Sequence, residues 1–160
     1  MQRRTLLQLG LAAGASLALA GCGFRLRGLD QTVMPIEALA LEGPDSELAR
    51  HVARRLEQAG TQIDDQAAQV LNLGAETVRE RRLSVLDSGH QEREMTLTVP
   101  FSVQRRADSA YLLDQQQLNV SERLTVNDDQ LLTQDDLRED ARDRLREAAA
   151  RQLMDRLRAL

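Results

Sequence analysis

The sequence predicts an α+β domain in which two helices pack on one face of a four-stranded, mostly antiparallel sheet. The predicted order is strand, helix, strand, strand, strand, helix. In two separate segments, apolar residues recur at three- and four-residue spacing, which is typical of a helix with one buried face. Over 95–103, apolar and polar residues alternate, which is typical of a half-buried strand. The 160 residues are 42% hydrophobic and 29% charged, a composition that fits one soluble globular domain.

The chain opens with the layout of a signal peptide. Arg3 and Arg4 precede an apolar run over 6–19, and small residues follow it. This run is shorter than the roughly 20 residues that a spanning helix needs, so we expect it to be removed. The arginine pair partly matches a twin-arginine signal, with the general export route as the favoured alternative.

Leu19-Ala20-Gly21-Cys22 resembles the lipobox of bacterial lipoproteins. In those proteins the cysteine sulfur takes a diacylglycerol, the leader is cut off, and the new amino terminus is acylated, for example with palmitate. A cysteine suits this chemistry because a thiolate is a good nucleophile near neutral pH. The resemblance implies that residues 1–21 are removed and that Cys22 carries lipid. Gly23, which follows it, implies sorting to the outer membrane. The alternative is that Cys22 is a buried thiol.

Residues 22–35 contain glycine, proline and polar side chains with little periodicity. They are predicted to form an extended, lipidated tether, and residues 36–160 are predicted to form the single folded domain. A first strand is expected over 36–41, ended by the Gly43-Pro44 turn signal. Because a helix follows this strand, we expect the strand to pair in parallel with a neighbour.

The first helix is predicted after that turn. Asp45 or Ser46 can cap its start, and Gly60 can stop it. Its apolar positions are Leu48, Val52, Leu56 and Ala59. His51 lies beside this apolar stripe with no potential ligand at a matching interval, so it is interpreted as a boundary residue.

The next segment, 70–86, is predicted to be extended with Gly74 inside it. A glycine there indicates a bulge or a close approach of two backbones, which would reconcile a change of apolar phase along the segment. The following strand buries Met95, Leu97, Val99, Phe101 and Val103. We expect Leu83 opposite Met95 and Val85 opposite Arg93, which makes His90 a loop-tip residue.

A turn is predicted at Asp108-Ser109, followed by a strand over 111–126. That strand places Leu118, Val120, Leu124 and Val126 on one face. Residues 127–130 are polar and end it. Thr133 can cap the last helix, whose many charged residues are interpreted as a solvated face.

Motifs for catalysis or metal binding are absent from the sequence. There is no Gly-x-Ser-x-Gly, phosphate-binding glycine loop or His-Glu-x-x-His, and two histidines with one cysteine cannot build the common nucleophile or metal arrangements. We therefore expect no enzyme activity, no catalytic residue, no metal and no cofactor beyond the covalent lipid on Cys22. A net charge of −4 and three aromatic residues also argue against nucleic-acid binding.

One basic cluster stands out on the second predicted hairpin: Arg79, Arg81, Arg82 and Arg93. A guanidinium group can bind two phosphate oxygens at once, so these residues are candidates for binding a phosphorylated ligand. The alternative is that they are surface residues paired with Glu76, Glu80, Glu92 and Glu94.

The segment Cys22-Gly23-Phe24-Arg25-Leu26-Arg27-Gly28 resembles the mature start of the LptE family of lipopolysaccharide-assembly lipoproteins. The family opens with Cys-Gly-aromatic-x-Leu-Arg, and the size and predicted element order are also similar, so the resemblance covers essentially the whole chain. It implies a domain that plugs the outer-membrane β-barrel lipopolysaccharide translocon, assists its assembly and helps deliver lipopolysaccharide to the cell surface.

The resemblance implies three partners, which are that barrel, lipopolysaccharide and outer-membrane lipid. It places the lipid-anchored protein on the periplasmic side or within the barrel lumen. Members of the family carry basic residues near the hairpin tip and after the last strand, where this chain has Asp87-Ser88 and Asn127-Asp128-Asp129. Arg79, Arg81, Arg82 and Arg93 are therefore nominated as local substitutes for binding lipopolysaccharide.

Two other functions are carried as alternatives. One is a generic outer-membrane-anchored periplasmic scaffold or pilotin-like assembly lipoprotein. The other is an anchored hydrolase, for which no nucleophile and base can be named in this sequence.

Overall fold

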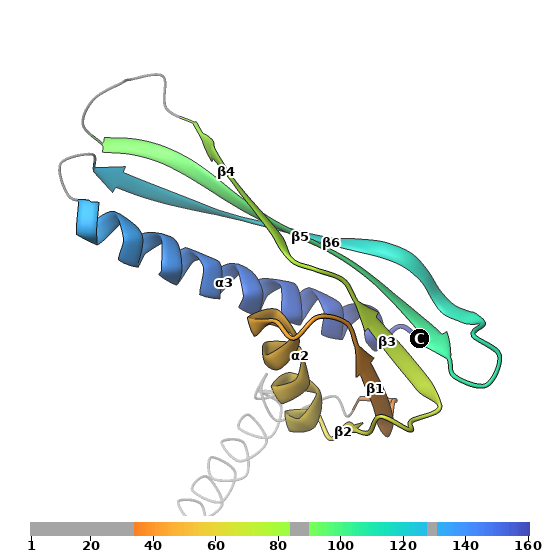
Figure 1. Cartoon of the computed structure of the whole chain (residues 1–160). Coiled ribbons are helices and arrows are strands. Elements are labelled where there is room, and N and C mark those ends of the chain that lie inside the picture. Colours follow the sequence, from red (N-terminus) through yellow and green to blue (C-terminus); the bar gives the residue numbers. More distant parts are fainter. Residues whose placement is uncertain (1–33, 84–89, 128–130) are drawn as a thin grey trace, which may run out of the picture. The chain divides into compact units, whose positions relative to one another are not determined.

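The computed structural model describes residues 34–83, 90–127 and 131–160 (Figure 1). Residues from Thr32 to the C-terminus form one compact unit. The described helices are α2 (Glu47–Gln58) and α3 (Leu131–Leu157). The described strands are β1 (Ala38–Glu42), β2 (Gln62–Ile63), β3 (Gln69–Leu73), β4 (Thr77–Arg82), β5 (His90–Arg105) and β6 (Tyr111–Asn127). The leader, Cys22 and most of the predicted tether lie outside the described residues.

The sheet is organised around β5. Antiparallel β6 pairs with one edge of β5 along most of its length. The other edge of β5 is shared by two shorter strands, since β3 pairs with residues 101–105 and β4 with residues 93–98. β1 lies parallel to both β2 and β3. The predicted α+β class and the parallel pairing of the first strand are confirmed, with six strands in the described part of the sheet where four were predicted.

The break between β3 and β4 occurs at Gly74. Its backbone N–H donates to the Pro100 carbonyl oxygen at 2.8 Å. A Cβ at this position would lie 2.6 Å from Pro100 Cγ, so a side chain has no room. The glycine therefore marks a close backbone approach, as predicted. The predicted extended segment 70–86 is divided there into two strands.

The core lies between one side of the sheet and the two helices. Its largest fully buried side chains include Leu39, Leu48, Leu56, Leu71, Met95, Leu97, Leu118, Leu145, Leu153 and Leu157. Burying one such side chain stabilises the fold by roughly 1.5–3 kcal/mol. Met34 also belongs to this core, with 3% of its surface exposed, so the packed domain begins by Met34.

The ends of α2 follow the predicted signals. Ser46 is the residue that caps the helix, because its Oγ accepts a hydrogen bond from the Ala49 N–H at 3.1 Å. Beyond the helix, Gly60 adopts a positive φ of 90°, which suits a glycine stop. His51 is half-buried beside the apolar stripe.

The predicted start of the last helix is wrong. α3 begins at Leu131, two residues before the expected cap at Thr133. A capping side chain contributes only about 1 kcal/mol, so packing of a long helix on the sheet can move the boundary past it.

The turn and strand after β5 are as predicted. Ser109 has a positive φ of 57°, and the Ala110 N–H donates to Asp108 Oδ1 at 3.2 Å. In β6 the even-numbered residues from Leu118 to Val126 lie opposite odd-numbered residues of β5, which face the helices. The alternation predicted for this strand is confirmed.

The predicted pairing of the second hairpin is wrong by three residues. Leu83 was expected opposite Met95, but its N–H donates to the Glu92 carbonyl oxygen at 2.8 Å, and Glu80 lies opposite Met95. The cause is the break at Gly74. Beyond it the even-numbered residues of β4 face the helices, so Leu83 does not set the buried phase.

His90 is also placed differently from the prediction. It is the first residue of β5 and pairs with Asn127 of β6, so it does not occupy the tip of the loop. The long β5–β6 ladder extends to this end of the sheet and takes His90 into it. Val85 and the predicted turn lie outside the described residues.

Candidate functional site

Three carboxylates project from the sheet toward α3. Glu80 in β4 and Glu122 in β6 both lie opposite the buried Met95 of the central strand, so they flank it on the helix-facing side. Glu76 precedes β4 in the link from β3. Carboxylates near a core need charged partners, because an unpaired buried charge is costly.

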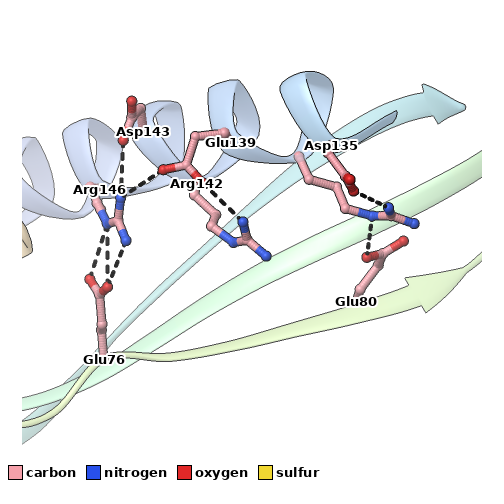
Figure 2. Close-up of polar contacts among 8 residues, drawn as sticks. Glu76, Glu80, Asp135, Glu139, Arg142, Asp143 and Arg146 are labelled. Atoms are coloured by element: carbon pink, nitrogen blue, oxygen red, sulfur yellow. Dashed lines mark hydrogen bonds and ion pairs between the residues drawn. The ribbon is translucent and has the colours of Figure 1, made fainter. Parts of the chain in front are cut away.

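Arginines of α3 supply those partners. Arg146 Nη2 lies 2.9 Å from Glu76 Oε1, and Arg138 Nε lies 3.2 Å from Glu80 Oε2. On the other flank of the helix, Arg144 Nε lies 2.9 Å from Glu122 Oε1. Figure 2 shows Glu76 and Glu80 pointing from the sheet toward the helix. These ion pairs hold α3 along both of its flanks.

Arg146 is the most extensively bound of these arginines. Its Nε and Nη2 both donate to the Glu76 carboxylate, and its Nη1 lies 3.0 Å from Asp143 Oδ1. The hydrogen bonds to Glu76 raise the pKa of Arg146, outweighing the effect of burial. Since 12% of the side chain is exposed, the guanidinium is a structural group with little surface left for a ligand.

Glu80 joins the sheet and the helix through two arginines. Arg93 Nη1 donates to Glu80 Oε1 at 2.7 Å, and Arg138 Nε donates to Oε2 at 3.2 Å. Burial raises the pKa of this carboxyl group, but the hydrogen bond from Arg93 and the charges of Arg138 and Arg93 together lower it by more than burial raises it. The net result is a pKa below the ordinary value. Glu80 is therefore held in its ionised form.

Two buried glutamines extend this polar network. Gln91 is 1% exposed and Gln134 is 5% exposed. Arg93 Nη2 donates to Gln91 Oε1 at 3.3 Å, and Arg138 Nη2 donates to Gln134 Oε1 at 3.4 Å. Buried polar groups require such partners. This end of the domain is consequently held together by a polar network as well as by apolar packing.

The structure divides the four predicted phosphate-binding arginines between the two faces of the sheet. Arg82 and Arg93 lie opposite each other on the helix-facing side. Arg79 and Arg81 alternate with them and lie on the outer face, which is defined here as the sheet face opposite the helices. Arg81 is 73% exposed at its side chain and pairs with Glu94 at 2.9 Å. The four residues are neighbours along the hairpin but do not form one site.

Sequence reasoning missed two features of this region. The arginines of α3 were interpreted as part of a solvated face, although their i, i+4 spacing over 138, 142 and 146 was a signal for one aligned flank. Arg123 of β6 was not singled out, yet it lies opposite Glu94 on the outer face. Its placement depends on the pairing of β5 with β6.

Among residues 34–83, 90–127 and 131–160, no cluster of three or more histidine, cysteine or acidic side chains is placed to hold a metal ion. Within the same ranges, no helix combines the length and apolar character needed to cross a membrane.

Comparison with known proteins gives one family and several similar folds. Residues 33–157 match the family model LptE, described as lipopolysaccharide-assembly. No curated protein matches the sequence.

Two crystal structures and one solution structure illustrate the fold similarity. A minor lipoprotein from Acinetobacter baumannii is 21% identical with a TM-score of 0.66, and the match covers 78% of this chain and 94% of that one. Rare lipoprotein B from Shewanella oneidensis is 24% identical, with a TM-score of 0.60 and coverage of 76% and 94%. Lipoprotein B from Nitrosomonas europaea is 20% identical, with a TM-score of 0.65 and coverage of 82% and 88%. At these identities the similarity shows the fold alone.

Proposed function

Since the chain belongs to the LptE family of lipopolysaccharide-assembly lipoproteins, we propose that it plugs the lumen of the outer-membrane β-barrel lipopolysaccharide translocon. In this role it assists assembly of the barrel and helps deliver lipopolysaccharide to the cell surface. The observation that carries the proposal is the family match over residues 33–157. The family is one of non-enzymatic assembly lipoproteins, and this chain is not an enzyme.

The polarity of the domain supports a position inside a barrel. Its outer sheet face carries exposed polar side chains such as Asn119, Ser121 and Thr125. The C-terminal end of α3 carries exposed ion pairs such as Arg158–Asp155 at 2.8 Å. Large outer-membrane barrels have polar, water-lined interiors, so a domain with a polar surface can be enclosed there without placing apolar side chains against the polar wall.

We propose that the protein reaches its partner through a lipid anchor. The leader, residues 1–21, is removed and Cys22 carries an S-diacylglycerol and an N-palmitoyl group in the outer membrane. Several acyl chains together give stable anchoring, which one chain does not. Cys22→Ala should move the protein from the membrane fraction to the soluble fraction without loss of fold, as measured by fractionation and circular dichroism.

Co-purification tests the plug function. A tagged full chain, extracted from membranes in detergent, should capture a large outer-membrane β-barrel protein that mass spectrometry identifies as the lipopolysaccharide translocon. The Cys22→Ala protein is treated with detergent beside it, so that loss of the anchor can be separated from loss of binding. An unrelated tagged outer-membrane lipoprotein is the control.

Failure of both the wild type and Cys22→Ala to capture any barrel would contradict the plug proposal. A secretin or a peptidoglycan enzyme as the reproducible partner would instead support the scaffold or pilotin-like alternative.

The ligand part of the proposal concerns the hairpin arginines. We propose that lipopolysaccharide contacts this hairpin, and of the nominated Arg79, Arg81, Arg82 and Arg93 the outer-face pair Arg79 and Arg81 is the better placed. Alanine substitutions should weaken lipopolysaccharide binding at physiological salt while the circular dichroism spectrum stays unchanged. Because Arg93 also binds Glu80, the pair Arg79→Ala and Arg81→Ala provides the cleaner variant.

A further inference from the structure

The outer face of the sheet gathers hydrogen-bonding side chains from three adjacent strands. Arg79, Thr96 and Ser121 form one cross-strand row. Thr77, Thr98 and Asn119 form the row on one side of it, and Arg81, Glu94 and Arg123 form the row on the other. In Figure 1 α3 lies against the opposite side of this part of the sheet and α2 lies near β1 and β2, so no described helix covers these rows.

The side chains of this face are open to a ligand. Arg79, Asn119, Ser121 and Arg123 are exposed, and Thr96 and Thr98 are half-buried. Thr96 Oγ1 and Ser121 Oγ lie 3.0 Å apart, which aligns two hydroxyl groups side by side. No large apolar side chain interrupts the three rows. The face therefore offers short hydroxyl and amide groups, which lose little conformational entropy when they bind.

The three rows carry a net positive charge, although the whole chain is negatively charged. The chain carries a net charge of −4. On the outer face Arg81 is neutralised by Glu94 at 2.9 Å, whereas Arg79 and Arg123 make no ion pair within the described ranges. Glu92 is an exposed acid near these rows, in the row beyond Arg123. The three rows thus hold three cations and one anion.

The spacing of the two unpaired arginines suits a ligand larger than a single phosphate. Adjacent strands lie about 4.8 Å apart, and successive residues on one face lie roughly 6.7 Å apart along a strand. Arg79 in β4 and Arg123 in β6 are two strands and one row apart. Their Cα atoms are therefore separated by about 12 Å, with the hydroxyl groups of Thr96 and Ser121 between them.

We propose that these rows form a binding patch for a phosphorylated saccharide, with Arg79, Arg123, Thr96, Thr98, Asn119 and Ser121 as its contact residues. Guanidinium groups bind phosphate oxygens through charge-assisted hydrogen bonds, and the hydroxyl and amide groups bind sugar hydroxyls. The inference deepens the ligand part of the proposed function. It rests on that function only for the source of the ligand, a phosphorylated sugar headgroup.

The helix-facing arginines are poorly placed for the same task. Arg93 has 20% of its side chain exposed and donates to Glu80 at 2.7 Å. A phosphate that recruited it would have to displace the Glu80 carboxylate and leave that charge without its closest partner. The outer patch binds an anion without breaking any contact between helix and sheet.

Titration of the full chain, purified in detergent, with N-acetylglucosamine 1-phosphate tests the patch. Amide chemical shifts should move at Thr96, Thr98 and Ser121 and stay constant at Gln91 and Gln134. N-acetylglucosamine and inorganic phosphate, used as separate probes, should each bind at least several-fold more weakly than the phosphorylated sugar. Equal affinity for inorganic phosphate alone would overturn the saccharide part of the proposal.

Substitutions locate the binding energy. Arg123→Gln and Arg79→Gln should each weaken binding of the phosphorylated sugar by roughly tenfold, because each removes a charge-assisted hydrogen bond. Arg142→Gln, on α3 and therefore away from the outer face, should leave it unchanged. Glu92→Gln should strengthen binding, because it removes a nearby negative charge. Equal affinities for Arg123→Gln and Arg142→Gln would overturn the patch, as would shifts confined to the helix-facing side.

The outcomes separate this inference from the plug function. A patch variant that loses sugar phosphate binding but still captures the barrel supports the patch. Failure of the wild type to bind the sugar phosphate, with barrel capture intact, overturns the patch and leaves the plug standing. Failure of the wild type to capture the barrel, with sugar phosphate binding intact, overturns the plug function and leaves the patch standing.

Discussion

Arg146 and Glu76 form an enclosed ion pair between the helix and the sheet. Their side chains are 12% and 19% exposed, and two guanidinium nitrogens donate to the same carboxylate. Such a pair is geometrically specific, and removing one partner leaves the other charge poorly solvated. The exposed ion pairs along α3 lack this property, because water can replace either partner.

Glu76→Gln should therefore lower the free energy of unfolding by about 1–2 kcal/mol. Glu139→Gln is the matched control, since the Glu139 side chain is 61% exposed while also pairing with Arg146 at 3.9 Å. Its effect should stay within about 0.5 kcal/mol. Urea unfolding of the two variants measures the difference, and equal losses would contradict the role given to Glu76.

Glu80 makes stability depend on pH. Burial raises its pKa, but the Arg93 hydrogen bond and the charges of Arg138 and Arg93 set the net shift, which is downward from 4.5. A carboxyl whose pKa is lower in the folded chain stabilises the fold fully above its unfolded pKa. This stabilisation is lost as the pH falls through the folded pKa.

Wild type should accordingly exceed Glu80→Gln in the free energy of unfolding at pH 7, and the gap should close as the pH is lowered from about 5 toward 3. Unfolding curves of both proteins at several pH values measure the gap. A gap that is the same at pH 7 and pH 3 would show that the ionised form of Glu80 does not contribute.

The cap of α2 isolates a local contribution to stability. Ser46→Ala removes the acceptor for the Ala49 N–H and should cost about 1 kcal/mol. Asp45→Ala changes the neighbouring residue, which the sequence offered as an equal candidate, and should cost much less. Thermal unfolding distinguishes them, and a larger loss for Asp45→Ala would reassign the cap.

The break between β3 and β4 is sensitive to any side chain. In Gly74→Ala the new Cβ would meet the Pro100 ring at 2.6 Å and its carbonyl oxygen at 3.2 Å. Strain of this kind costs about 1–3 kcal/mol. Urea unfolding measures the loss, and Ala75→Ser, at the exposed next position, provides the control. A Gly74→Ala protein as stable as wild type would mean that the Pro100 ring can move aside without cost.

Much of the secondary structure could be predicted because local patterns determine it. Alternation identified β5 and β6, and the helical stripe with Ser46 and Gly60 identified α2. The pairing of β4 could not be predicted in the same way. The buried side changes at Gly74 from odd-numbered to even-numbered residues, and the approach of Gly74 to Pro100 of another strand cannot be read from local patterns.

The limits of the folded domain can be tested at Met34. The residue lies within the predicted tether, yet it is 3% exposed and its N–H donates to the Ala59 carbonyl oxygen at 3.4 Å. Met34→Ala should destabilise the domain by about 2–4 kcal/mol. Leu160→Ala, at a residue 47% exposed, should change stability little. Equal values from urea unfolding would place Met34 outside the core.

For the candidate site, the sequence could predict which residues share a strand but not how the whole domain arranges them. Sequence proximity located a basic hairpin correctly, because Arg79, Arg81 and Arg82 lie in one strand. It could not sort these residues between the two faces, since that depends on the pairing with β5. Nor could it bring in Arg123, which is more than 40 positions away from Arg79 and becomes a neighbour only through the sheet.

The shared edge of β5 has a mechanical consequence. Between the end of β3 at Leu73 and the start of β4 at Thr77, this edge is joined to β5 by the Gly74–Pro100 hydrogen bond, whereas the ladder between β5 and β6 continues past this break. Within the described strands, the paired β5 and β6 connect the β1 end of the sheet to the β4 end, and α3 packs along both of these strands. The domain should bend most easily at this break, because β3 and β4 are each paired with β5 and not with each other.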